Sequence, residues 1–594
     1  MTAIPAAGGV DVAVRAPGAT ALWLCLFDSP VERRIAMARD GDMWRAHVAG
    51  LAAGARYGFR ANGPPPFDIA KLLVDPHAVT LDRPFACDPR LTEPGVDTAA
   101  LVPCAIVTAP LPPLDLPPLF RPGGLVYEVN VRAFTMRHPD VPAAQRGTIA
   151  ALAHPAVIAH LRRLHVAAVE LMPIVAWIDE RHLPPLGLSN GWGYNPVVPM
   201  ALDPRLAPGG MRELRDTVAA LRAAGIGTIL DLVLNHSGES DLAGPTLSLR
   251  GLDDAAYARA PDGTLINDAG TGNTLDFANP AVRALALDTL RHFVTQAGVD
   301  GFRFDLATVM ARGPGFDAAA PIFAEIAADP LLSSRVLIAE PWDTGPGGYQ
   351  LGRFPRDWLE WNDRYRDDVR RFWRGDGGAG ALATRMMGSS DVFGAARTRG
   401  VSFVAAHDGF TLADTVSYAD RHNHANGEDN RDGHAGEVAW NNGVEGASED
   451  PAIIARRAAD LRALLGTLFA TRGTIMLTAG DEFGRTQHGN NNAYAQDALL
   501  WLDWAARDRA LEDHVADLAC RRAACPSLAD LAIPHDAVWR RRDGAPMRDA
   551  DWNHAYGFEL RLPDAIVTVD RSSRTVTLHP TGQPGHVDPA AATL

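Results

Sequence analysis

The stretch VDGFRFDLA, residues 299–307, places two charged side chains inside an otherwise apolar strand. Phe302 and Phe304 have the character of a buried strand, yet Arg303 and Asp305 alternate with them. Because successive side chains of a strand point to opposite faces, Arg303 and Asp305 share one face and the two phenylalanines share the other. Burying a charge costs free energy unless the charge is paired, so the polar face of this strand is expected to serve a purpose.

Around this stretch, strands alternate with helices from Leu125 onward. The expected strands are residues 125–131, 166–172, 226–236, 299–305, 336–340, 401–408 and 474–482. The expected helices are residues 148–164, 211–224, 280–297, 317–328 and 452–470. At least seven parallel strands over roughly 380 residues favour an α/β fold with a (β/α)8 TIM barrel over a doubly wound sheet. No GxGxxG motif or phosphate-binding P-loop motif follows any of these strands, which disfavours a nucleotide-binding fold.

Further segments flank this barrel. Residues 1–107 contain short β-like segments broken by Gly, Pro and Asp, which predicts an N-terminal β-sandwich. Residues 108–124, TAPLPPLDLPPLFRPGG, are too rich in proline for a regular helix or a central strand and predict a linker. The barrel is expected over residues 125–505, and residues 506–594 contain the β-like segments of a C-terminal β-sandwich domain.

Composition limits the partners and the location of the protein. Of 594 residues, 47% are hydrophobic and 21% are charged, which is ample for a large core. The net charge of -15 argues against a nucleic-acid partner. The start of the chain lacks a signal-peptide pattern and no stretch of about 18 apolar residues occurs, so a cytoplasmic protein without a membrane span is expected. The five cysteines form no CxxC pair, which predicts reduced thiols.

Other expected strands also end in polar residues. In a parallel barrel the active site forms at the carboxyl ends of the strands. These ends contribute Asp231, Asn235 and His236 from DLVLNH, Glu340 from VLIAE, and His407 and Asp408 from VAAHD. Helix N-caps and ion pairs explain any single aspartate at such a place equally well. Four strands that converge on one polar cup favour a functional site instead.

Four carboxyl groups, an arginine and two histidines suit retaining glycoside hydrolysis. That reaction needs one carboxylate as the nucleophile and one carboxylic acid as the proton donor, about 5 to 5.5 Å apart. Arg303 beside Asp305 favours the ionised form that a nucleophile needs. Glu340 follows an apolar run without a neighbouring cation, so desolvation would raise its pKa and keep it protonated as an acid catalyst. A third carboxylate can hold the sugar ring.

A catalytic metal is the competing interpretation of these strand ends. Barrel amidohydrolases bind zinc through an HxH motif on the first strand. Here that strand contains YEVNVR, residues 127–132, and no HExxH motif occurs in the chain. No metal site and no cofactor are therefore predicted, although calcium held by Asp or Asn oxygens in a loop stays an alternative.

Four short motifs resemble the conserved regions of the α-amylase superfamily, glycoside hydrolase family 13. In chain order they are DLVLNH (231–236), GFRFDLA (301–307), IAEPWD (338–343) and AAHD (405–408). The resemblance implies that Asp305 is the nucleophile, Glu340 the general acid/base and Asp408 the stabiliser of the transition state. It further implies that the sugar next to the cleaved bond is bound by Asp231, His236, Arg303 and His407.

Two aromatic residues complete the predicted site. Tyr194, in NGWGYNP (190–196), matches the aromatic residue of the family that stacks on the same sugar. Trp192 lies beside it in a loop flanked by glycines, and we interpret it as a further stacking platform. His422 and His424 lie in a very polar segment, residues 420–434, which is either a solvated loop or a wall that shapes the substrate site.

Longer segments are similar to the isoamylase-type bacterial glycogen-debranching enzymes. They are AKLLVDPHA (70–78), VELMP (169–173), PWDTGPGGYQLGRFP (341–355), WLEWNDRYRDDVRRFWRG (358–375), HDGFTLADTVSYADRHNHANGEDNRDG (407–433) and AGDEFGRTQHGNNNAYAQD (479–497). This resemblance implies a carbohydrate-binding-type N-terminal sandwich and a C-terminal β-domain around the barrel. It implies hydrolysis of α-1,6 branch linkages, with a branched α-glucan such as glycogen or limit dextrin as the partner and neither nucleic acid nor membrane.

Other functions stay open at this stage. A glucan-branching transferase or a trehalose-releasing trehalohydrolase would share the three carboxylates, and residues 407–433 favour debranching over both. A glycan-binding protein without activity is a third alternative. A binder does not need Asp305, Glu340 and Asp408 together, so their presence favours an enzyme.

Overall fold

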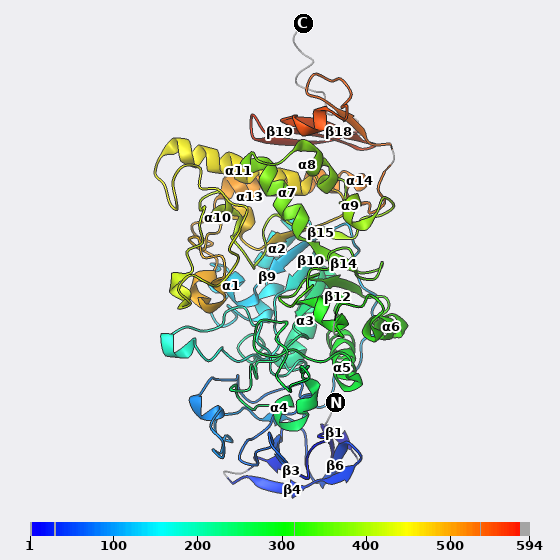
Figure 1. The fold of residues 1–594 in the computed structure, drawn as a ribbon, viewed down its shortest axis with the longest axis vertical. Coiled ribbons are helices and arrows are strands. Elements are labelled where there is room, and N and C mark those ends of the chain that lie inside the picture. Colours follow the sequence, from blue (N-terminus) through cyan, green and yellow to red (C-terminus); the bar gives the residue numbers. More distant parts are fainter. Residues whose placement is uncertain (1–2, 7, 29–30, 314, 535, 582–594) are drawn as a thin grey trace.

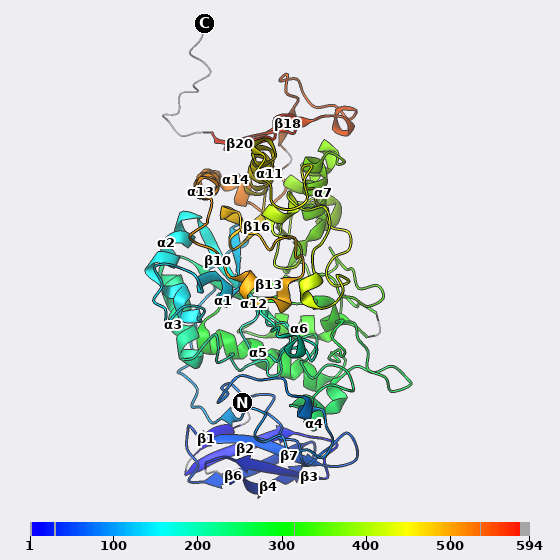
Figure 2. The same ribbon diagram turned by 90° about the vertical axis from the view of Figure 1, so that its left-hand side faces the viewer.

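A computed structural model describes residues 3–6, 8–28, 31–313, 315–534 and 536–581 of the chain. Two N-terminal sheets, a closed barrel and a C-terminal sheet follow one another along the long axis of the molecule (Figures 1 and 2). Within the described ranges, no helix combines the length and the apolar character needed to cross a membrane.

Eight strands close the central barrel. They are β9 (Leu125–Val129), β10 (Val166–Leu171), β11 (Gly227–Leu232), β12 (Gly301–Phe304), β13 (Val336–Ala339), β14 (Leu359–Asn362), β15 (Gly400–Ser402) and β16 (Thr474–Thr478). Each strand pairs in parallel with the next, and β16 pairs with β9 to close the ring. The predicted (β/α)8 barrel is confirmed.

Strand β14 is the barrel strand that the sequence analysis did not anticipate. It has only four residues, and Glu360 and Asn362 interrupt its apolar pattern. Glu360 is buried in an ion pair with Arg399, and the Asn362 side chain accepts a hydrogen bond from Tyr365 N at the start of the next helix. These two partners satisfy the polar groups, so a polar four-residue segment can form a buried strand.

The helices cover the outside of the barrel. The longer ones are α2 (Pro155–Arg163), α3 (Gly210–Ala223), α5 (Pro280–Ala297), α6 (Pro321–Ala328), α7 (Asp363–Arg374), α8 (Ala379–Met386), α11 (Pro451–Phe469) and α13 (Arg509–Ala523). The short ones are α1 (Val131–Thr135), α4 (Leu249–Leu252), α9 (Ser390–Phe393), α10 (Leu412–Thr415), α12 (Asp497–Leu500) and α14 (Pro526–Ala529). The five predicted helices are present, except that the one expected over residues 148–164 is divided at His154 into a 3₁₀ helix (Ile149–Ala153) and α2. Proline at the first helical position and an Asn or Asp N-cap explain the start of α5 and of α11.

The two faces of β12 pack as its alternation predicts. Phe302 and Phe304 are fully buried in the core between the strands and the surrounding helices, where Phe304 stacks on Trp358 at a ring-centroid distance of 5.0 Å. Burial of each phenylalanine contributes about 1.5–3 kcal/mol. Arg303 is buried on the opposite face and lies over the ring of Trp361, which belongs to the apolar core inside the barrel.

The N-terminal region forms two packed antiparallel sheets. One has the order β1 (Ala3–Ala6), β2 (Gly9–Arg15), β6 (Met43–Ala49), β5 (Ala38–Asp40), and the other has the order β4 (Arg33–Ala36), β3 (Ala21–Leu26), β7 (Arg56–Asn62), β8 (Ala105–Ile106). Their shared core includes Ala176, Val197 and Leu252. Ala176 and Val197 belong to the loop after β10 and Leu252 belongs to α4, which follows β11, so the N-terminal sheets pack against the carboxyl-end side of the barrel.

Residues 108–124 contain no helix and no strand, and barrel side chains bind their backbone. Arg215, Arg222 and Arg335 donate hydrogen bonds of 2.7 Å to carbonyl oxygens of this segment. The segment therefore lies along the outside of the barrel. The division of the chain into domains at residues 107, 124 and 505 stays a prediction.

The C-terminal region is one antiparallel sheet in the described part of the chain. Its strands, in order, are β17 (Val538–Arg540), β18 (Gly557–Leu562), β19 (Ala565–Asp570) and β20 (Thr575–Pro580). The sequence analysis expects a sandwich here, but the layer that faces this sheet consists of α11 and α13 (Figure 2). Phe558, Leu560 and Val567 join the core of the barrel helices, so the sheet needs no second sheet to bury its apolar face.

Candidate active site

The carboxyl ends of the barrel strands open into a cavity of about 980 Å³. The predicted site residues that line it are Trp192, Tyr194, His236, Asp305, Glu340, His407 and Asp408. The remaining two, Asp231 and Arg303, lie beneath the cavity and are buried. The structure therefore brings all nine predicted residues together at one end of the barrel.

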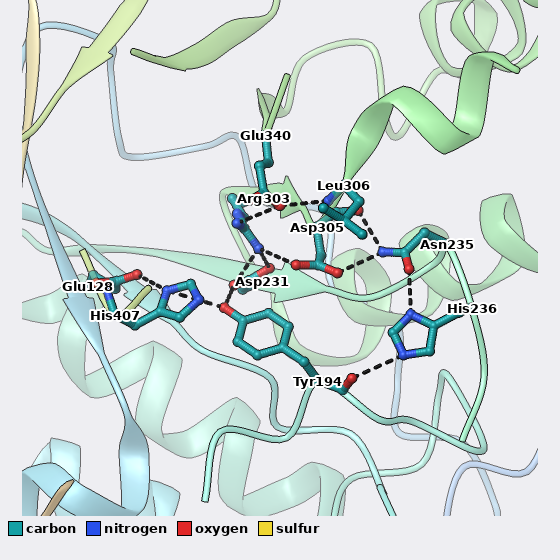
Figure 3. Close-up of polar contacts among 10 residues, drawn as sticks. All are labelled: Glu128, Tyr194, Asp231, Asn235, His236, Arg303, Asp305, Leu306, Glu340 and His407. Carbon is teal, nitrogen blue, oxygen red and sulfur yellow. Dashed lines mark hydrogen bonds and ion pairs between the residues drawn. The ribbon is translucent and has the colours of Figure 1, made fainter. Parts of the chain in front are cut away.

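Arg303 is the centre of the site, as Figure 3 shows. Its Nη1 donates to the two carboxylate oxygens of Asp231 at 2.8 and 3.0 Å and to Oδ1 of Asp305 at 3.1 Å. Its Nη2 lies 2.9 Å from Oε2 of Glu340. One buried guanidinium thus contacts three carboxyl groups, which explains why β12 tolerates an arginine inside the barrel.

Asp305 is held from two sides. Besides Arg303, the side-chain amide of Asn235 donates to Oδ2 of Asp305 at 2.7 Å and to its backbone carbonyl at 2.8 Å (Figure 3). His236 contacts the amide oxygen of Asn235 and fixes its orientation. The sequence analysis places Asn235 at the same strand end as His236 but assigns it no catalytic or binding role, and the structure shows that it holds Asp305.

Glu340 has the environment of an acid catalyst. Burial raises its pKa, Arg303 opposes that effect and Asp305 adds to it, and the resulting pKa is about 8. Its Oε2 also accepts a hydrogen bond of 2.7 Å from Leu306 N. Leu306 has φ +41°, a left-handed conformation that costs a leucine free energy and aims its backbone N–H at Glu340. The Glu340 carboxyl is therefore oriented and holds its proton near neutral pH.

Asp231 lies on the floor of the site. Burial raises its pKa to about 6, although Arg303 lowers it. The hydroxyl of Tyr194 donates to its Oδ2. Asp231 therefore joins Arg303 to Tyr194, which lines the cavity above it.

Glu128, from the first barrel strand, orients His407 and was missed by sequence reasoning. Its Oε1 lies 2.6 Å from Nδ1 of His407, and its Oε2 accepts from the His407 backbone N at 2.9 Å (Figure 3). Burial lowers the pKa of His407, but the Glu128 charge outweighs burial and raises it. The sequence contains a signal that could have identified Glu128: it is a charged residue inside the apolar strand LVYEV, as Arg303 is in its own strand.

The two predicted aromatic residues pack around His407. Tyr194 stacks on its ring at a centroid distance of 4.9 Å and an interplanar angle of 20°. Trp192 meets the same ring edge-on at 4.9 Å and 87°, and only 8% of Trp192 is exposed. Both residues therefore support His407, and both reach the cavity wall.

Comparison with known proteins gives the family. Residues 2–78 match the family described as carbohydrate-binding module 48 (isoamylase N-terminal domain). A glycogen debranching enzyme of Serratia proteamaculans (strain 568) is 45% identical over 583 residues, which cover 93% of this chain and 86% of that protein. The chain belongs to the glycogen debranching enzyme family. A second member, from Yersinia pseudotuberculosis serotype IB, is 45% identical over 585 residues, which cover 93% of this chain and 88% of that protein.

This member of the glycogen debranching enzyme family also shares its fold with solved structures of pullulanases. Pullulanase from Bacillus acidopullulyticus superimposes with a TM-score of 0.70 at 20% identity and covers 96% of this chain and 68% of that one. Pullulanase complexed with maltotetraose from Anoxybacillus sp. LM18-11 superimposes with a TM-score of 0.69 at 21% identity, over 96% of this chain and 81% of that one. The resemblance to isoamylase-type debranching enzymes and the barrel with a carbohydrate-binding-type N-terminal sandwich are confirmed.

Proposed function

We propose that this member of the glycogen debranching enzyme family is a glycoside hydrolase that cleaves α-1,6 branch linkages of glycogen or limit dextrin with retention of configuration. The observation that carries the proposal is the Arg303 guanidinium, which lies within 3.1 Å of both Asp305 and Glu340 at the base of the cavity. The relatives that cover most of the chain are named glycogen debranching enzymes, which supports the same conclusion.

The first step forms a covalent glycosyl-enzyme. A carboxylate oxygen of Asp305 attacks the anomeric carbon of the branch, and the bond from that carbon to the glycosidic oxygen breaks. Glu340 gives its proton to the departing oxygen, which becomes a hydroxyl of the main chain. The charge that Glu340 acquires is stabilised by Arg303, whose Nη2 lies 2.9 Å away.

The second step releases the branch. Glu340, now ionised, removes a proton from a water molecule, and the water oxygen forms a bond to the anomeric carbon as the bond to Asp305 breaks. A linear chain with a new reducing end leaves, and both carboxyl groups return to their starting protonation states.

The remaining predicted residues would bind the sugar at the cleaved bond. His236 and His407 lie at the cavity wall, Asp231 and Arg303 lie beneath it, and Asp408 offers a carboxylate oxygen to a sugar hydroxyl. Tyr194 and Trp192 would supply apolar surface for the ring. The cavity that His236, His407, Asp408, Tyr194 and Trp192 line supports this assignment.

Product analysis tests the proposed function. Glycogen, limit dextrin and amylose are incubated with the protein, and reducing ends and released chains are measured. We expect linear chains from the two branched glucans and no change in amylose. Cleavage of amylose would favour a different hydrolase, and branches that move without new reducing ends would favour a branching transferase.

The pH dependence of activity follows from the carboxyl groups. Glu340 must be protonated to act as the acid, so kcat/KM on limit dextrin should fall as the pH rises through about 8. Activity should also fall in acid, because protonation of Asp231, with a pKa of about 6, weakens its ion pair with Arg303. Rates measured from about pH 4 to pH 10 should give a bell-shaped profile; a flat alkaline side would contradict the role of Glu340.

A further inference from the structure

We propose that His434 is a positioning residue for Asp408, and that a buried network of asparagines joining two loops of the barrel holds it there. This inference rests on the proposed function, because Asp408 matters only if its carboxylate binds the reacting sugar. No motif in the sequence points to His434, and its contact with Asp408 exists only in the folded chain.

Asp408 differs from the other two catalytic candidates in how it is held. Asp305 and Glu340 are both bound by Arg303, which lies on a barrel strand. The Asp408 side chain has a different hydrogen-bond partner in the described part of the chain: its Oδ2 lies 3.1 Å from Nε2 of His434. His434 comes from the loop after β15, so a loop residue sets the orientation of this carboxylate.

Asn491, in the loop after β16, fixes the position of His434. Its side-chain amide donates to the carbonyl oxygen of His434 at 3.0 Å, and its own carbonyl oxygen accepts from Gly409 N at 3.1 Å. Asn423 Nδ2 donates to Asn491 Oδ1 at 2.8 Å, and Asn491 N donates to Asn423 Oδ1 at 2.9 Å. Asn491 therefore binds both the residue after Asp408 and the residue that contacts it.

A second pair of asparagines extends the network. Asn490 Nδ2 donates to Asn426 Oδ1 at 2.8 Å, and Asn426 Nδ2 donates to the carbonyl oxygen of Asn492 and to Oδ2 of Asp432, both at 2.7 Å. Asn423, Asn426, Asn490 and Asn491 are all at most 3% exposed. A buried amide without a partner is unfavourable, so these bonds hold the polar segment 420–434 in one place. Part of that segment, Glu428, Asp432 and Gly433, lines the cavity, while other residues of it such as His424 are exposed.

The charges around His434 favour an ion pair at neutral pH. The other charged groups that face the pair are His407, Arg366, Glu437 and, on the side of Asp408, Glu340. Glu437 is already paired with Arg370 at 2.6 Å, so Asp408 is the acid that remains for His434. The Asp408 charge raises the pKa of His434 to about 9. Burial tends to raise the pKa of Asp408, but His434 lowers it to about 2.

The ion pair leaves part of Asp408 open to the cavity. Its side chain is 36% exposed, and the hydrogen bond to His434 engages Oδ2. Oδ1 is then available to accept a hydrogen bond from a sugar hydroxyl, in an orientation set by His434. Because His434 keeps its charge below a pH of about 9, the contribution to sugar binding should be present at neutral pH and lost as the pH rises through that value.

Binding of maltotetraose tests this inference without catalysis. The affinity is measured from about pH 6 to pH 10 in the Glu340→Gln background, which removes the titration of the acid catalyst. In that background His434→Ala should weaken binding at pH 7 by about tenfold or more. His434→Gln, which keeps an N–H donor without the charge, should recover part of the affinity and lose the fall above about pH 9.

His424→Gln is the matched control, because His424 is an exposed histidine of the same loop. Equal affinity of the His434→Ala and His424→Gln variants would overturn the inference. If the His434→Ala variant does not fold, the pH dependence of maltotetraose binding by the His434→Gln variant still tests the inference. If the unchanged chain debranches glycogen but its affinity for maltotetraose does not depend on His434, only this inference is refuted. If the affinity depends on His434 but the unchanged chain does not debranch glycogen, only the proposed reaction is refuted.

Discussion

Replacing Asp305 with Asn is expected to lower kcat on glycogen by about 10⁴- to 10⁶-fold, the range seen when a covalent nucleophile is removed. An amide of the same size still fills the site between Arg303 and Asn235 but cannot form the glycosyl ester on which both steps depend. The unchanged shape should keep KM close to its original value. Steady-state rates of reducing-end release measure the effect.

The control for this variant is Asp481→Asn. Asp481 is also a buried aspartate paired with an arginine, Arg485, but it does not line the active-site cavity. Its replacement should change thermal stability more than kcat. If Asp305→Asn retained activity within about tenfold of the unchanged chain, Asp305 could not be the nucleophile.

Replacing Glu340 with Gln should lower kcat on glycogen by about 10²- to 10⁴-fold, the usual contribution of general acid/base catalysis. The reason is that a glutamine cannot protonate the departing sugar oxygen. On α-maltosyl fluoride the first step should survive, since fluoride leaves without a proton as the anomeric carbon bonds to Asp305. The second step still needs a base, so the glycosyl-enzyme should accumulate and be visible by mass spectrometry.

Two controls test whether the loss of activity comes from the missing acid/base group: added azide and a matched variant. Azide attacks the anomeric carbon without a base, so it should restore turnover of the fluoride and yield a glycosyl azide. Glu360→Gln removes a buried glutamate whose pKa burial raises to about 7 but which lies outside the cavity, and it should behave like the unchanged chain in both assays. Turnover of glycogen by Glu340→Gln within tenfold of the unchanged chain would refute its role.

The barrel could be predicted from sequence because its signals are local. Side chains alternate along a strand and repeat every 3.6 residues along a helix, so the polar and apolar faces of β12 and the five helices follow from short windows. β14 escaped this reasoning because Glu360 and Asn362 can be buried only where partners from other segments, such as Arg399 and Ser389, satisfy their polar groups. Likewise, the C-terminal sheet packs on α11 and α13. The sequence of the sheet shows that one face is apolar but does not show whether helices or a second sheet cover that face.

The sequence by itself determined that Asp231, Arg303, Asp305 and Glu340 stand at the ends of barrel strands, because the strand pattern and its polar endings are contiguous. Asp408 differs, because the strand expected over residues 401–408 ends at Ser402 and Asp408 lies in the loop that follows. The tertiary structure decided their partners from distant parts of the chain. Glu128 reaches His407 across 279 residues, and His434 reaches Asp408 across 26. Such contacts depend on which strand ends and loops are neighbours in the folded chain. Residues that are far apart in the chain produce no periodic sequence pattern, so their contact cannot be predicted from the sequence.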